Sequence, residues 1–294
     1  MVGEEKGWFM GWFLIPKFHQ IARLSTVLSQ SLTFIFFFLI GLELREGIAR
    51  PKEAVLPTLC ALAGMVAPAL IFLGLQPHSG AWAVSMPTDV ALAIGALSFV
   101  GKRVNPAVRL YLLTLAIADD FISLVVIGLF FRNDLDLSSA IYTIGAATIG
   151  FVLPFRKPLI RVLGPVATFI IIPVYLWINL LSKIDFSVST GKISISVLVA
   201  RVVGKVLGIS LAAWLLTRFT KLRLPAGLTL HEIVGVGLLA GMGLTVSLVI
   251  AGITLSAPND LAQVRTGLFF AAVVSGIAGA LWLRTVKGGA PRQD

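Results

Sequence analysis

Charge is scarce in this 294-residue sequence: Asp, Glu, Lys and Arg make up 13% of it, against about 25% in an ordinary soluble domain. Hydrophobic residues make up 57%, and the mean hydropathy is +0.95. This composition excludes a typical soluble globular domain. It predicts an all-α polytopic membrane protein, because an α-helix satisfies its own backbone hydrogen bonds in a bilayer.

Cysteine and histidine are also rare, and both shortages exclude classes of site. The single Cys60 rules out a disulfide framework within the chain. The three histidines, His19, His78 and His231, lie near the ends of predicted spans, which leaves a buried imidazole metal site unsupported. We therefore expect no cofactor. The net charge of +10 falls mainly in short loops, where it sets orientation, so we expect no nucleic-acid partner.

Long apolar stretches divide the chain. Residues 1–26 form a predicted N-terminal interfacial segment, because WFMGWFLI at 8–15 is too short to cross a bilayer. Residues 27–294 form one predicted transmembrane domain. A crossing needs about 20 residues. Nine stretches are long enough, at 27–48, 54–75, 81–100, 107–131, 138–155, 162–182, 193–218, 231–255 and 263–284.

Basic residues are distributed unequally between the two sides of these spans. Alternate loops hold fifteen Lys and Arg, and the opposite loops hold four. Because basic loops stay in the cytoplasm, this asymmetry predicts a multi-pass membrane protein with a cytoplasmic C-terminus.

Three acidic residues, Asp89, Asp119 and Asp120, and two basic residues, Arg201 and Lys205, lie inside predicted spans. Each charge costs about 3 kcal/mol at membrane depth, so five uncompensated charges would cost about 15 kcal/mol. We expect these residues to share a paired or hydrated site.

Asp119 and Asp120 are adjacent, and adjacent residues on a helix are about 100° apart, so both can border one cavity. Two close carboxylates resist ionising together, and a bound cation relieves their repulsion. Oxygen ligands suit a hard cation. Asp119 and Asp120 are therefore the candidate ligands for sodium and for protons.

Two predicted spans carry signals for a broken helix. Pro87 interrupts the span 81–100, just before Thr88 and Asp89, because proline lacks a backbone donor. Gly241 and Gly243 mark a second break in the span 231–255. A break leaves opposed helix ends, so Asp89 would stabilise the positive ends and Lys205 would offset the negative ends. Asp89 alone also fits a structural cap. Arg201 is expected to snorkel or to pair locally.

These motifs together resemble one family, the NhaA sodium/proton antiporters, a known example of inverted repeats with broken helices. The resemblance rests on FFFLIGLELREG (36–47), PTDVALAIGAL (87–97), LAIADD (115–120), VVGKVLGISL (202–211) and LPAGLTLHEIVGVGLLAGMGLTVSLVI (224–250). It implies an inverted-repeat antiporter fold with two discontinuous transmembrane helices and about nine spans here. Repeat one would cover about 54–131 and repeat two about 193–284.

The resemblance also implies roles for individual residues. Asp119 and Asp120 match the paired aspartates of the family, with Asp120 as the main sodium ligand. Thr88 and Asp89 match the hydroxyl and the acid at the first break. Lys205 matches the intramembrane lysine, which pairs with Asp119 in the proton-loaded state.

The sequence departs from the family in three respects. It is a shortened member, lacking the first span and part of the middle region, between residues 131 and 165. It carries Arg201 where the family pattern is apolar. In the family, the shortened region belongs to a group of helices that makes the dimer contact. A homodimer is therefore possible, but the sequence does not decide whether one forms.

The resemblance implies a secondary active transporter of the bacterial inner membrane, not an enzyme. We expect it to exchange sodium or lithium for protons electrogenically and to serve pH and sodium homeostasis. A degenerate, non-transporting relative that acts as a cation-binding or assembly protein is the alternative. An intramembrane aspartyl protease is a further alternative, but the usual GxGD context is missing.

Overall fold

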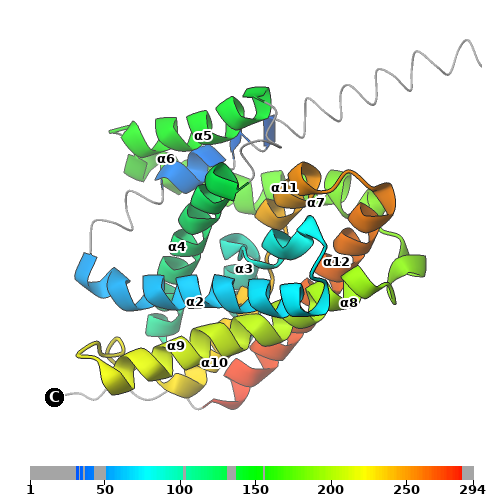
Figure 1. Ribbon diagram of the computed structural model, residues 1–294. Coiled ribbons are helices and arrows are strands. Elements are labelled where there is room, and N and C mark those ends of the chain that lie inside the picture. Colours follow the sequence, from blue (N-terminus) through cyan, green and yellow to red (C-terminus); the bar gives the residue numbers. More distant parts are fainter. Residues whose placement is uncertain are drawn as a thin grey trace, which may run out of the picture.

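The computed structural model describes residues 31–32, 34–35, 37–42, 51–101, 104–130, 137–154 and 156–286, and these residues form helices joined by short links (Figure 1). The described part contains no strand, as expected for a helical membrane protein. The predicted interfacial segment 1–26 lies outside the described residues.

Three long helices begin at a proline. They are α2 (Pro51–Leu75), α4 (Pro106–Phe130) and α12 (Pro258–Thr285). Proline suits the first helical position because the N–H that it lacks would have no partner there. The sequence thus marks where these spans start.

Two further spans contain a wider, π-helical turn. One consists of α6 (Arg156–Val166), the π-turn η2 (Ala167–Ile171) and α7 (Ile172–Asn179). The other consists of α8 (Lys192–Val199), the π-turn η5 (Ala200–Gly204) and α9 (Lys205–Phe219). Short turns η3 (Leu181–Lys183) and η4 (Phe186–Val188) link these two spans. Turns of this kind are frequent at functional sites, and η5 contains Arg201.

Both predicted helix interruptions are present. The first lies between the 3₁₀ helix η1 (Gly80–Ser85) and α3 (Val90–Val100), where the chain passes through Pro87. The second separates α10 (Leu230–Ala240) from α11 (Thr245–Thr254), and these two helices are bent by 48° relative to each other. Proline causes the first break, and the second falls at Gly241–Leu244 as the glycines predict.

The described residues contain six helical segments long and apolar enough to cross a membrane, or seven when α10 and α11 count as one span. This makes the protein polytopic. Of the nine predicted spans, 138–155 corresponds to α5 (Leu137–Val152), which has only 16 residues. The span 27–48 lies partly outside the described residues. Nine spans therefore remain a prediction.

The buried apolar residues form two large clusters, and several spans contribute to both. On α2, Leu56 belongs to one cluster and Met65 to the other. On the span α8–α9, Val197 and Ile209 are divided in the same way. Arg201 and Lys205 occur between Val197 and Ile209, and so these two charges lie near the middle of their span.

Helices α2 and α9 lie side by side and in close contact (Figure 1). A Cβ atom added at Gly204 would meet Pro68 Cα at 2.7 Å, and one at Gly208 would overlap the carbonyl of Ala63. Only glycine allows this approach, so Gly204 and Gly208 are packing positions.

Candidate functional site

All five predicted intramembrane charges are buried. The exposed fraction is 2% for Asp89, 0% for Asp119 and 4% for Asp120, and it is 0% for both Arg201 and Lys205. They come from the first break, the middle of α4 and the π-turned span. The structure thus brings charged residues from distant parts of the sequence together in the interior of the protein.

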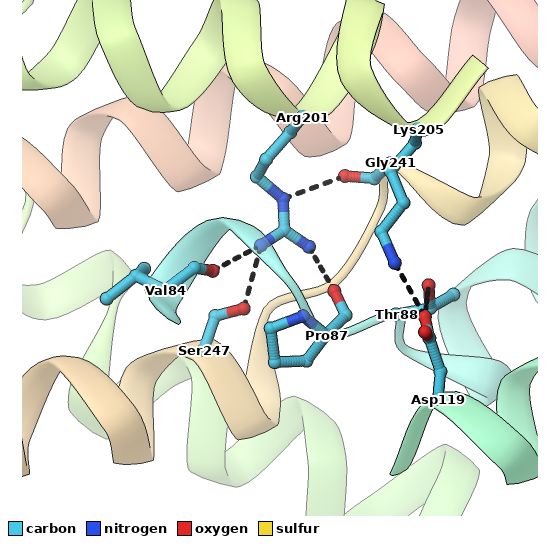
Figure 2. Close-up of polar contacts among 8 residues, drawn as sticks. All are labelled: Val84, Pro87, Thr88, Asp119, Arg201, Lys205, Gly241 and Ser247. Carbon is cyan, nitrogen blue, oxygen red and sulfur yellow. Dashed lines mark hydrogen bonds and ion pairs between the residues drawn. The ribbon is translucent and has the colours of Figure 1, made fainter. Parts of the chain in front are cut away.

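Asp119 is the centre of a three-residue cluster (Figure 2). Lys205 Nζ lies 2.6 Å from Asp119 Oδ2, and both side chains are fully buried. The Thr88 hydroxyl donates to the same carboxylate oxygen. The sequence resemblance implied the pair of Asp119 and Lys205, and the structure contains it. What the pair does in the protein stays a prediction.

Asp119 and Asp120 begin a short polar stripe on α4. Asp120 is buried beside Asp119, and Ser123 follows one helical turn later with 1% of its surface exposed. Asp119 Oδ1 and Ser123 Oγ make no hydrogen bond to any part of the chain that the structure describes. Sequence reasoning missed Ser123, although its spacing of four residues from Asp119 places both on one helix face.

Asp89 lies between the N-terminal ends of two half-helices. Its Oδ1 accepts from the backbone N–H of Leu92 at 3.3 Å and caps α3. Its Oδ2 accepts from Thr245 at the start of α11, at 2.9 Å from the hydroxyl and 3.4 Å from the backbone N–H. Helix N-termini carry partial positive charge, so one carboxylate stabilises both ends. The sequence predicts the residue but not Thr245.

Of the two roles expected for Arg201, snorkelling or local pairing, snorkelling to the interface is wrong, because the side chain is fully buried and is paired inside the protein. Its guanidinium donates to groups of both interrupted spans, as Figure 2 shows, whereas Lys205 donates to Asp119. Among the described residues, the hydrogen bonds to the carbonyls at the negative helix ends come from Arg201, and the offset of these ends by the charge of Lys205 stays a prediction. Sequence patterns gave no sign of this division.

Among the described residues, no group of three or more His, Cys, Asp or Glu could hold a metal ion. The site instead offers two adjacent carboxylates, Asp119 and Asp120, beside one ammonium group. A carboxylate pair of this kind can hold a hard monovalent cation, protons or the ammonium, and these positive groups compete for the same carboxylate oxygens.

Known proteins align with nearly the whole length of this chain. A family model described as Na⁺/H⁺ antiporter 1 matches residues 12–157 and 154–283. Proteins named Na⁺/H⁺ antiporter NhaA from Salmonella paratyphi B, Salmonella typhimurium and Escherichia coli O1:K1 are each 27% identical over 351 residues. These alignments cover 96% of this chain and 90% of each relative.

The same comparisons bear on the shortened middle region. The alignments span 351 positions and the chain has 294 residues, so at least 57 positions of the relatives have no counterpart here. The two matched segments of the family model meet at residues 154–157. Both observations agree with a shortened middle region, which the sequence predicts between residues 131 and 165.

Proposed function

The chain belongs to the Na⁺/H⁺ antiporter 1 family, and from this premise we propose that it exchanges sodium or lithium for protons across the bacterial inner membrane. The single observation that carries the proposal is the fully buried contact of 2.6 Å between Lys205 Nζ and Asp119 Oδ2. A counter-ion supplied by the protein itself is what an empty cation site needs at membrane depth.

The exchange follows from competition for the carboxylates. A sodium ion bound by Asp120 and Asp119 replaces the positive charge that Lys205 supplies, so Lys205 has to withdraw when the ion binds. When protons or Lys205 neutralise the carboxylates, sodium leaves. Asp119 Oδ1 and the hydroxyl of Ser123 are buried oxygens that can complete the ion's shell.

The arrangement of the spans supports an inverted-repeat fold with repeats at about 54–131 and 193–284. In the first repeat the spans are α2, the interrupted pair η1 and α3, and α4. In the second they are α8–α9, the interrupted pair α10 and α11, and α12. The middle span of three is broken in each half, and paired breaks of this kind lie at the substrate site of transporters.

The membrane potential can drive the proposed exchange if the exchange is electrogenic. One elementary charge that crosses the membrane gains about 2.3 kcal/mol per 100 mV. An exchange of more protons than sodium ions can therefore be driven by the membrane potential, and it would serve pH and sodium homeostasis. The excess of basic residues in alternate loops supports a cytoplasmic C-terminus. A homodimer remains part of the proposal.

The test is sodium-dependent collapse of a pH gradient in proteoliposomes. We expect exchange by the unaltered protein and none by Asp120→Asn, with Asp185→Asn, at an exposed acid outside the spans, as the matched control. Exchange preserved in Asp120→Asn contradicts the ligand assignment. Sodium binding by the unaltered protein without exchange supports instead the cation-binding or assembly role.

A further inference from the structure

Arg201 is a charged side chain at the centre of a span, in the π-turn η5, and none of its surface is exposed. A buried guanidinium at membrane depth is costly unless it is compensated. The groups that compensate this buried charge therefore determine what Arg201 does.

Four acceptors surround the guanidinium, and Figure 2 shows them approaching it from both interrupted spans. They are the carbonyls of Gly241 (3.1 Å from Nε), Val84 (2.7 Å from Nη1) and Pro87 (2.6 Å from Nη2), and the hydroxyl of Ser247 (2.8 Å from Nη1). Each acceptor is formally neutral. Within the described chain, Arg201 makes no hydrogen bond to a carboxylate.

The positions of these acceptors explain why a positive charge is favourable at Arg201. Val84 lies at the end of η1, and Gly241 caps the end of α10, so both carbonyls belong to C-terminal helix ends. Such ends carry partial negative charge and unpaired carbonyls. Arg201 neutralises both ends at once, and Asp89 does the same for the opposite, N-terminal ends of α3 and α11.

Space for the guanidinium is built into the second break. A Cβ atom at Gly243 would overlap both Arg201 Nη2 and the Pro87 carbonyl. This observation is independent of the hydrogen bonds. It shows that the link between α10 and α11, which contains Gly243, packs closely against both the Arg201 side chain and the link through Pro87.

We propose that Arg201 is a fixed positioning residue that holds the two interrupted spans together, which leaves Lys205 as the exchangeable counter-ion of Asp119. Arginine keeps its charge at physiological pH, and its planar fork matches several acceptors at once. Because its partners are neutral, Arg201 makes the same contacts whether sodium, a proton or Lys205 occupies Asp119.

Arg201 also influences the ion site through one peptide unit. The Pro87 carbonyl that it holds precedes Thr88, whose hydroxyl donates to Asp119 Oδ2. Loss of Arg201 therefore releases Thr88 and weakens sodium binding, in addition to loosening the crossing of the two spans.

The test compares Arg201→Met and Lys205→Met, each alone and combined with Asp119→Asn. Thermal unfolding is measured in detergent without sodium. We expect Arg201→Met to lower the Tm by about 10 °C, and Asp119→Asn not to restore it, since no carboxylate is the partner. Asp119→Asn restores most of the stability of Lys205→Met. Arg218→Met, at an exposed arginine of α9, is the matched control with an unchanged Tm.

A transport measurement adds a result that loss of stability alone does not produce. Arg201→Lys keeps the charge but offers three donors from one point, so it reaches fewer acceptors. We expect it to fold with an intermediate Tm and to raise the sodium KM of exchange about threefold, with little change in the maximal rate. Arg201→Met, where it folds, raises the KM about tenfold.

Several outcomes overturn the proposal. One is recovery of Arg201→Met by Asp119→Asn, which would make Arg201 a counter-ion of the ion site. Another is an Arg201→Lys protein with the Tm and KM of the unaltered chain, and this outcome decides the matter even if Arg201→Met does not fold. The proposal rests on sodium exchange only for the KM. If the unaltered protein does not exchange sodium, the proposed function fails, and the Tm comparison still tests Arg201.

Discussion

The buried pair of Lys205 and Asp119 leads to a prediction about stability. Lys205→Met removes the ammonium but keeps a long side chain, and Asp119→Asn removes the carboxylate charge but keeps an oxygen that accepts from Thr88. Each single change leaves one charge buried at a site where neither side chain is exposed. The double change removes both charges together.

The magnitude follows from that burial. Removal of one partner of a buried ion pair destabilises a protein by about 3–5 kcal/mol, whereas replacement of both partners is often nearly neutral. The costs of the two single changes then sum to about 6–10 kcal/mol, whereas the double change costs little, so the expected coupling exceeds the usual range of about 0.5–3 kcal/mol. For a chain of this size, each single change lowers the Tm by about 6–20 °C.

Tryptophan fluorescence during heating in detergent, without sodium, gives the four Tm values of this double-mutant cycle. Addition of sodium is a second arm: the ion should raise the Tm of Lys205→Met more than that of the unaltered chain, because no ammonium competes for Asp119. If the effects of the two single changes simply add, the pair contributes no specific stability. The argument for an internal counter-ion would then be refuted.

Two further predictions concern the second helix break. Gly243→Ala should abolish assembly or exchange, because its methyl group overlaps the Arg201 guanidinium. Gly252→Ala is the control and should be tolerated, because no atom lies within 4 Å of its added Cβ. Expression and Tm in detergent distinguish the two variants. Thr245→Val should lower stability by about 1–3 kcal/mol, because Asp89 loses its hydroxyl donor, and Thr245→Ser should keep most of it. Equal Tm values for the valine and serine variants would contradict this role of the hydroxyl.

The local chemistry of the chain made much of the fold predictable. Pro87 cannot continue a helix, and the chain leaves its helix there. The glycines at 241 and 243 predict the second break without a proline. The span count was harder, since α5 is apolar but has only 16 residues.

The site was only partly predictable, for two physical reasons. Contacts between distant residues, such as that of Asp89 with Thr245, depend on how the spans cross, and no local pattern encodes them. The π-turn at Ala200–Gly204 also changes which residues of the span share a face. The sequence therefore assigns Lys205 to the helix ends, whereas Arg201 makes the hydrogen bonds there.

The glycine contacts between α2 and α9 have a mechanical consequence. At Gly204, the last residue of η5 before α9, the backbone lies directly against Pro68 of α2, with no side chain between them. Separating the two helices by about 1 Å would open a gap too narrow for lipid or water, and up to about half of the dispersion attraction across it would be lost. The two helices therefore move as one rigid body. Any rocking that opens the ion site alternately to the two sides of the membrane must take place in the broken spans that cross beside them.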